Sequence, residues 1–179
     1  RFDLMHPADQ LVAIMDRIYY RGTTTTSGGN LSIRDRDGSV WITPSGVDKG
    51  SLGRGDIMRI LPDGRFEGAH RPSSEYPFHH SVFKRPPDLG AVLHAHSPGL
   101  VACSIVRRLP EVLLTAHSYE VCGELAMAPY ALPGSDELGA AIGAEFEKGY
   151  SVVLLENHGV VIGAPDMDRA FMVFETLET

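Results

Sequence analysis

The stretch AVLHAHS, residues Ala91–Ser97, decides how the rest of this chain is organised. Alternate side chains of a β-strand point to the same face and recur every ~6.6 Å, two residues at ~3.3 Å each. His94 and His96 therefore project to one side of the predicted strand, where a ring nitrogen of each can bind one metal ion at ~2.0–2.1 Å. Two alternating histidines by themselves are more often ordinary hydrogen-bonded residues than ligands, so a metal site requires further donors.

The further donors come from two distant segments. Glu75 lies in RPSSEYPF, and His158 precedes a glycine in LLENHGV. Three histidines and one carboxylate predict a site for Zn²⁺ or a similar divalent ion, and this donor set is typical of sites that open to substrate rather than of closed, cysteine-rich structural sites. The two cysteines, Cys103 and Cys122, lack CxxC spacing, so neither a cysteine zinc site nor a disulfide framework is expected.

Composition limits the classes of protein to consider. A chain of 179 residues with 43% apolar content is expected to form one globular domain over residues 1–179, with a sizeable core. The net charge of −7 and the lack of a basic run with interleaved aromatics argue against general nucleic-acid binding. The sequence has no signal-peptide layout and no apolar run near the ~18 residues of a membrane span, which predicts a cytoplasmic protein without a membrane partner.

Local patterns in the first half predict one helix and two hairpins. Apolar residues at helical spacing predict a helix over 8–20, which Gly22 ends. The Asp37–Gly38 turn lies between apolar runs at 31–34 and 40–43, and predicts an antiparallel hairpin. The turn at 62–64 lies between runs at 56–60 and 65–67 and predicts a second one.

The second half is predicted to alternate between helices and strands. Helices are expected from 72 to about 84, where Pro86 and Pro87 stop the helix, and over 99–108, 136–148 and 169–177. Strands are expected over 91–96, 152–155 and 160–162, with weaker ones over 111–114 and 125–127 on either side of a loop. Together these elements predict an α/β fold with three α/β/α layers and a mostly antiparallel mixed central sheet.

Two polar segments have both a structural and a functional interpretation. The glycine-rich stretch TTTTSGGN, residues 23–30, fits a mobile loop, which we favour from this segment alone, or a nest of backbone N–H groups that faces a phosphate. Ser73 and Ser74 fit helix N-caps or, with the free N–H groups of a helix start, a phosphate seat. Glu75 in the first turn can also simply complement the helix dipole.

Five short motifs occur in order along nearly the whole chain: SGGN (Ser27–Asn30), TPSG (Thr43–Gly46), PSSE (Pro72–Glu75), HAH (His94–His96) and NHG (Asn157–Gly159). Each motif alone is weak. In this order and at these intervals, the chain resembles the class II aldolase/adducin family, in particular its members of the L-fuculose-phosphate aldolase type.

The resemblance implies roles for the motif residues. It implies one zinc ion per subunit held by His94, His96 and His158, with Glu75 as the fourth ligand and as the catalytic acid/base once substrate displaces it from the metal. It implies a phosphate cradle formed by Gly29, Asn30, Ser45, Gly46, Ser73 and Ser74. It also implies a homotetramer with active sites between subunits, and a family C-terminal tail beyond the sequence given.

The activity that the resemblance implies is that of a metal-dependent lyase. A zinc-dependent class II aldolase cleaves a phosphorylated ketose, such as L-fuculose 1-phosphate, reversibly into dihydroxyacetone phosphate and an aldehyde through a metal-stabilised enediolate. Decarboxylation of a 3-oxo-tetronate 4-phosphate is the second choice, and dehydration of a methylthioribulose phosphate is a third. A non-catalytic adducin-like binding module is disfavoured because the metal histidines are retained. Glu75 argues against the 4-epimerase branch, which carries Asp there.

Several residues receive less specific interpretations. The proton donor that such aldolases take from a neighbouring subunit is left open among Thr115, His117 and Tyr119. A half-buried pocket is expected to raise the pKa of Glu75 once it leaves the metal. Lys49 is predicted to be solvated. Five histidines are expected to be surface or packing residues: His6, His70, His79, His80 and His117.

Overall fold

One mixed sheet of eight strands runs through the computed structural model, which describes residues 2–84 and 88–179. The strand order is β4-β3-β2-β1-β5-β8-β7-β6, and every neighbouring pair is antiparallel except β6 and β7. The strands are β1 (Asn30–Arg34), β2 (Val40–Ile42), β3 (Met58–Ile60), β4 (Phe66–Glu67), β5 (Ala91–Ala95), β6 (Leu125–Ala128), β7 (Val152–Leu155) and β8 (Gly159–Ala164). The predicted mostly antiparallel sheet is confirmed.

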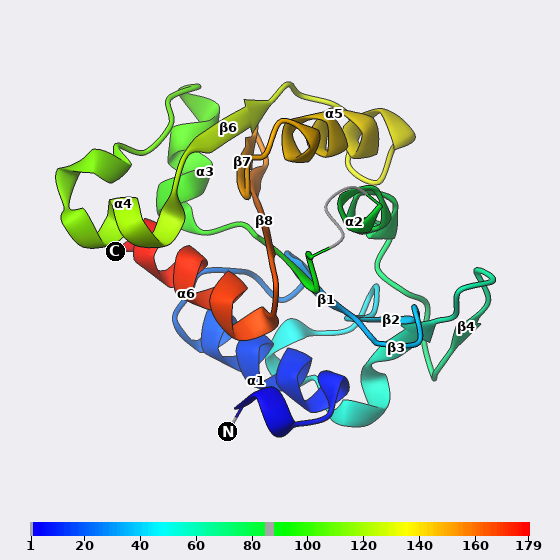
Figure 1. Ribbon diagram of the computed structural model, residues 1–179. Helices are drawn as coiled ribbons and strands as arrows, with labels where there is room; N and C mark the ends of the chain where they lie inside the picture. Colours follow the sequence, from blue (N-terminus) through cyan, green and yellow to red (C-terminus); the bar gives the residue numbers. More distant parts are fainter. Residues whose placement is uncertain (1, 85–87) are drawn as a thin grey trace.

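Helices cover both faces of this sheet and complete the three predicted layers (Figure 1). The helices are α1 (Pro7–Tyr20), α2 (Tyr76–Phe83), α3 (Pro98–Ile105), α4 (Ala116–Cys122), α5 (Asp136–Glu147) and α6 (Met167–Glu178), with short 3₁₀ turns η1 (Phe2–Leu4), η2 (Lys49–Ser51), η3 (Arg54–Asp56) and η4 (Val112–Leu114). One core lies between the sheet and α1, α3, α4 and α6, and a second lies between the sheet and the α2–α5 pair.

Strand β5 lies in the middle of the sheet, and its side chains alternate between the two cores. Leu93 and Ala95 belong to the core under α1 and α6, whereas Val92 belongs to the core under α2 and α5. His94 shares the parity of Val92, and its ring meets Phe78 of α2 edge-on at 5.4 Å. The predicted alternation therefore directs the first histidine of HAH toward α2.

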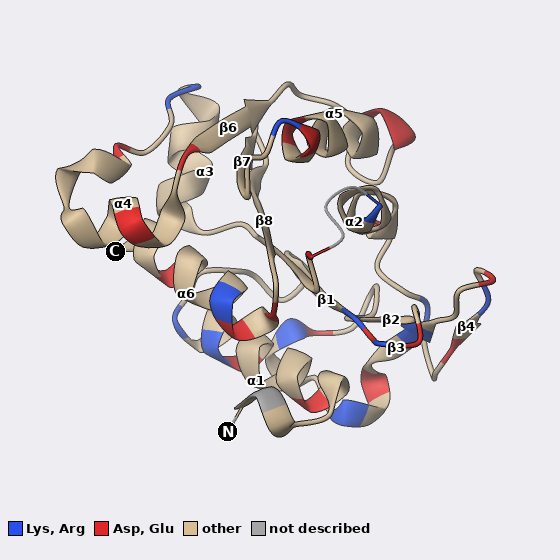
Figure 2. Cartoon of the chain, in the orientation of Figure 1, with Lys and Arg blue, Asp and Glu red and all other residues tan. Residues whose placement is uncertain are grey.

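Charged residues are unevenly distributed over the fold. Figure 2 shows charged positions on the helices and on the β3–β4 hairpin, whereas β7 and β8 contain none. Within the ranges that the structure describes, no helix has both the length and the apolar character needed to cross a membrane.

Two local predictions between residues 111 and 122 are wrong. The segment predicted as a strand at 111–114 forms the 3₁₀ turn η4, because the Glu111 side chain accepts a hydrogen bond from the Leu113 N–H. The segment predicted as a loop forms α4, because the Thr115 side chain caps its start by accepting from the Ser118 N–H. Side-chain capping outweighs the strand preference of the apolar run, and Val121 in the last turn of α4 joins the core.

The start of α2 also differs from the prediction. The helix begins one residue after Glu75, which itself occupies the N-cap position without a side-chain capping bond. Ser73 instead forms a tight turn in which its hydroxyl oxygen accepts from the Glu75 N–H at 3.2 Å. The two serines are therefore not the N-caps of this helix. The predicted stop at Pro86 and Pro87 lies outside the described residues.

Candidate metal centre

His94, His96 and His158 present one ring nitrogen each to a common point. The three ligand atoms lie within 4.8 Å of one another, and the ring centroids are 4.7–4.8 Å apart. His94 belongs to β5, His96 follows it directly, and His158 lies in the turn between β7 and β8. The structure thus brings together three residues from two separate motifs, HAH and NHG.

Glycines allow these segments to approach so closely. A Cβ atom at Gly159 would lie 2.5 Å from the Ala95 carbonyl oxygen and 2.9 Å from His96 Cδ2, and one at Gly28 would lie 2.7 Å from His96 Nδ1. Gly29 has a φ of +70°, and a Cβ there would lie 2.8 Å from the His94 carbonyl oxygen. The glycines of NHG and SGGN therefore serve the packing around the histidine strand.

The Glu75 carboxylate lies beside the triad and approaches two of its rings. Its Oε2 lies 3.3 Å from His94 Nε2, and its Oε1 lies 3.5 Å from His158 Nε2. The residue is only 8% exposed. The cluster therefore contains three imidazoles and one carboxylate. These groups come from the start of α2, from β5 and the residue that follows it, and from the β7–β8 turn.

The donor set and its hydrogen bonds fit a divalent metal ion. His94 Nδ1–H donates to the Val160 carbonyl oxygen at 2.9 Å, which leaves Nε2 facing the cluster, as metal-bound histidines commonly do. His96 Nε2 lies 2.9 Å from that nitrogen. Glu75 Oε1 and His158 Nδ1 are buried without a hydrogen-bond partner among the described residues. Such a triad can bind a divalent cation.

Electrostatics keep two of these rings neutral. Burial, and secondarily the charge that His94 carries when protonated, lowers the pKa of His96 to about 3 and that of His158 to about 4. For Glu75, burial raises the pKa, but the His94 charge and hydrogen bonds from His94 and Asn30 together lower it more, so the net pKa lies well below its usual range. The raised pKa expected for Glu75 refers to the carboxylate after its release from a bound metal, so it stays a prediction.

The residues expected to hold phosphate lie on three connected loops. The Ser45 N–H donates to the Arg71 carbonyl oxygen at 2.9 Å, and the Ser73 N–H donates to the Thr43 carbonyl oxygen at 3.2 Å, which joins the TPSG and PSSE segments. The Thr43 side chain accepts from the Leu31 N–H, which joins both to the start of β1. The structure exposes Ser45, Gly46 and Ser74, and buries Gly29, Asn30 and Ser73.

Asn30 has partners other than an open phosphate seat. Its side-chain amide donates to Glu75 Oε2 at 2.7 Å, and its Oδ1 accepts from His79 Nε2 at 2.5 Å. His79, expected at the surface or in packing, is 0% exposed. Its spacing of four residues from Glu75 is a sequence signal that would have linked the two, because Glu75 occupies the N-cap and His79 lies one turn further along α2.

Lys49 is a second residue that sequence reasoning missed. It was predicted to be solvated, but it is only 3% exposed, and burial lowers the pKa of its ammonium group. Its Nζ donates to the carbonyl oxygens of Pro44 at 2.7 Å and Val47 at 3.3 Å, and its N–H donates to the Thr26 carbonyl oxygen at 2.9 Å. One lysine therefore connects the SGGN and TPSG loops.

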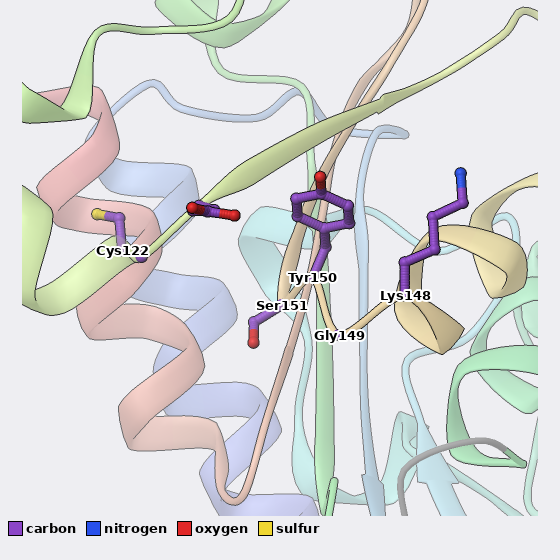
Figure 3. A pocket seen from close by; sticks show the side chains of 7 residues that line it. Cys122, Lys148, Gly149, Tyr150 and Ser151 are labelled. Carbon is purple, nitrogen blue, oxygen red and sulfur yellow. The ribbon is translucent and has the colours of Figure 1, made fainter.

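Three hollows on the described surface are lined by residues outside the triad. A cavity of about 390 Å³ lies between α4 and α5, and Figure 3 shows Cys122 and Lys148 at its opposite ends with side chains that do not point toward each other. Thr115 and His117 line a different hollow, of about 640 Å³, beside α6, and Tyr119 lines a third. The histidine cluster is therefore the strongest candidate for a reactive site.

Known proteins resemble this chain in sequence and in fold. Methylthioribulose-1-phosphate dehydratase of Acidiphilium cryptum is 36% identical over 183 residues, covering 96% of this chain and 86% of that protein. The 3-oxo-tetronate 4-phosphate decarboxylase of Pectobacterium atrosepticum is 31% identical over 173 residues, covering 94% of this chain and 79% of that protein. A solved structure of L-fuculose 1-phosphate aldolase superposes with a TM-score of 0.83 at 31% identity, covering 96% of this chain and 81% of that one.

These relatives are enzymes that act on different phosphorylated compounds, so their shared feature is the fold and the family. The family model described as Class II Aldolase and Adducin N-terminal domain matches residues 9–179. This chain therefore belongs to the class II aldolase and adducin N-terminal domain family.

Proposed function

We propose that this chain is a zinc-dependent lyase that cleaves a phosphorylated ketose, of the L-fuculose 1-phosphate type, reversibly into dihydroxyacetone phosphate and an aldehyde. The observation that carries the proposal is the cluster of the buried His94 with the half-buried His96 and His158, with Glu75 within 3.5 Å of two of the rings. Three imidazoles and one carboxylate favour Zn²⁺, and we propose one ion per chain.

The ion would supply Lewis acidity, stabilising the negative charge that develops beside the substrate carbonyl as a carbon–carbon bond breaks. Glu75 would act as the acid/base that exchanges a proton with the substrate. Its Oε2 is held by Asn30, whereas Oε1 has no hydrogen-bond partner among the described residues, so Oε1 is the atom proposed to donate and accept it.

The phosphate would be held by the three connected loops. Gly29, Gly46 and Ser74 offer backbone N–H groups there, and Ser45, Ser73 and Ser74 offer hydroxyls, because the Ser45 and Ser73 N–H groups already join the loops to each other. The buried Lys49 ammonium adds a positive charge close to the TPSG loop. Binding energy from this remote group would orient the reacting carbons. A full role for Asn30 in holding phosphate is less favoured, because its side chain is bonded to Glu75 and His79.

Relatives support a second candidate within the same chemistry. The dehydratase and decarboxylase named above are 36% and 31% identical to this chain, and both act on phosphorylated substrates by name. Decarboxylation of a 3-oxo-tetronate 4-phosphate, or dehydration of a methylthioribulose phosphate, is therefore the alternative. We also propose that residues 1–179 form a single domain, that the chain assembles as a homotetramer with active sites between subunits, and that it is cytoplasmic.

A product screen tests the proposal. Zinc-loaded and metal-free protein would be incubated with L-fuculose 1-phosphate, a 3-oxo-tetronate 4-phosphate and methylthioribulose 1-phosphate. Zinc-dependent release of dihydroxyacetone phosphate supports the aldolase, whereas release of carbon dioxide or water moves the assignment to an alternative. Glu75→Gln is expected to retain metal and lose most turnover. Turnover that survives complete metal removal would contradict the proposal, and so would a metal-free protein that unfolds, because that would indicate a structural ion.

A further inference from the structure

Ser32, His79 and Asn30 form a continuous series of hydrogen bonds that ends on Glu75. Ser32 Oγ lies 2.6 Å from His79 Nδ1, His79 Nε2 lies 2.5 Å from Asn30 Oδ1, and the Asn30 amide nitrogen lies 2.7 Å from Glu75 Oε2. The series runs from β1 to α2 and back, beneath the metal-site carboxylate. Ser32 and His79 are fully buried, and Asn30 is nearly so.

The ionised Glu75 carboxylate determines which group donates and which accepts in each hydrogen bond of this series. An ionised carboxylate only accepts, so Asn30 must present its NH₂ group to Glu75 and its carbonyl oxygen to His79. That carbonyl oxygen requires a proton on His79 Nε2. A neutral His79 then has a lone pair on Nδ1, which accepts a hydrogen bond from the Ser32 hydroxyl.

We propose that His79 is a positioning residue for this site: its Nε2–H fixes the Asn30 amide so that Asn30 holds Glu75 Oε2 and leaves Oε1 free for proton transfer. The inference rests on the proposed function for its catalytic consequence, but not for its geometry. Ser32 selects the tautomer of His79 by donating to Nδ1. His79 lies behind Asn30, so it acts on the site through Asn30 and Glu75.

Packing makes this arrangement rigid. The His79 ring stacks on Phe78 at a centroid distance of 4.6 Å and an interplanar angle of 17°. Burial lowers the pKa of His79 to about 3, which keeps the ring neutral and so able to accept at Nδ1 and donate at Nε2. With the neighbouring ring fixed, the amide of Asn30 cannot rotate without losing a bond at each end, since both of its polar atoms are committed.

Two substitutions of His79, one that keeps a side-chain N–H donor and one that removes it, test the proposal. His79→Gln keeps a side-chain N–H near the Nε2 position, whereas His79→Leu removes it while filling the buried space. Partners behind metal ligands typically contribute ~10–100-fold in metal affinity or activity. We expect His79→Leu to lower kcat and zinc affinity by ~10–100-fold with KM nearly unchanged, and His79→Gln to recover most of the loss. His80→Gln, at the exposed neighbouring position, is the matched control.

Three readouts keep the test decisive. Zinc affinity, measured by competition with a chromophoric chelator, does not depend on any substrate. Nuclear magnetic resonance of ¹⁵N-histidine-labelled wild-type protein reports the tautomer even if His79→Leu fails to fold, and Ser32→Ala is expected to weaken the preference for Nε2–H. An Nδ1–H tautomer, equal impairment by Leu and Gln, or unchanged zinc affinity and kcat in His79→Leu would overturn the proposal. If the wild-type protein turns over no phosphorylated substrate, the proposed function fails, while zinc affinity and the tautomer still decide the role of His79.

Discussion

Replacing Gly159 by alanine is the most direct perturbation of the histidine cluster that leaves every polar group in place. The new Cβ would lie 2.5 Å from the Ala95 carbonyl oxygen and 2.9 Å from His96 Cδ2. An ordinary contact needs about 3.4 Å, so the Ala95 contact must open by about 0.9 Å. Because the obstacle is backbone of the central strand β5, a side-chain rotation cannot relieve it.

That shift is large compared with what a metal site tolerates. Ligand distances are held within about 0.2 Å, so moving the β7–β8 turn away from β5 by several times that amount separates His158 from His94 and His96. We expect Gly159→Ala to lower zinc affinity by at least ~tenfold, equivalent to ~1.4 kcal/mol, and to cost ~1–3 kcal/mol of unfolding free energy from overpacking.

The assay is chelator competition for zinc affinity, together with urea denaturation of the metal-free protein. The matched control is Gly55→Ala, because a Cβ at Gly55 meets nothing within 4 Å and its φ requires no glycine. Gly55→Ala should bind zinc like the wild type. Wild-type zinc affinity in Gly159→Ala would refute the argument that this glycine sets the spacing of the cluster.

Two further predictions concern pH and the phosphate loops. In the metal-free protein, His79, His96 and His158 stay neutral in the fold, with pKa values of about 3 to 4 against the ordinary histidine value of 6.5, so the unfolded chain binds protons first as the pH falls. The free energy of unfolding, measured in urea, should therefore be constant above about pH 6.5 and decrease toward pH 4, by up to ~1.4 kcal/mol per pH unit for each histidine. A free energy of unfolding that rises on acidification would contradict these assignments. Lys49→Met removes the Nζ hydrogen bonds to the carbonyl oxygens of Pro44 and Val47. Steady-state kinetics should then show the KM for a phosphorylated substrate raised ~tenfold, with kcat little changed. An unchanged KM would show that the loops do not need this lysine.

Sequence patterns predicted the parts of this protein that depend on local rules. The alternation of His94 and His96, the turn residues of the hairpins and the helix predicted over 136–148 each follow from a few neighbouring residues, and the structure contains all three. Order among five motifs added His158 and Glu75, which no local rule connects to the strand.

What the sequence could not supply depends on contacts between distant segments. The burial of Lys49 follows from carbonyl groups of a loop that folds over it, which neither charge nor position indicates. The partners of Asn30 and His79 lie on different elements, so the glycine-rich motif gave no sign that Asn30 joins them, although the four-residue spacing links His79 to Glu75. Capping by Glu111 gave a 3₁₀ turn where the apolar run predicted a strand, and capping by Thr115 gave α4 where a loop was predicted.

X-ray absorption spectroscopy of the zinc-loaded protein tests the central claim most directly, because it reports the ligands of the ion without requiring the substrate. The account predicts one zinc per chain with three imidazole nitrogens at ~2.0–2.1 Å and an oxygen ligand, and loss of this signature in His158→Ala. A coordination sphere that contains sulfur, or fewer than two imidazoles, would contradict the assignment of the metal to His94, His96 and His158.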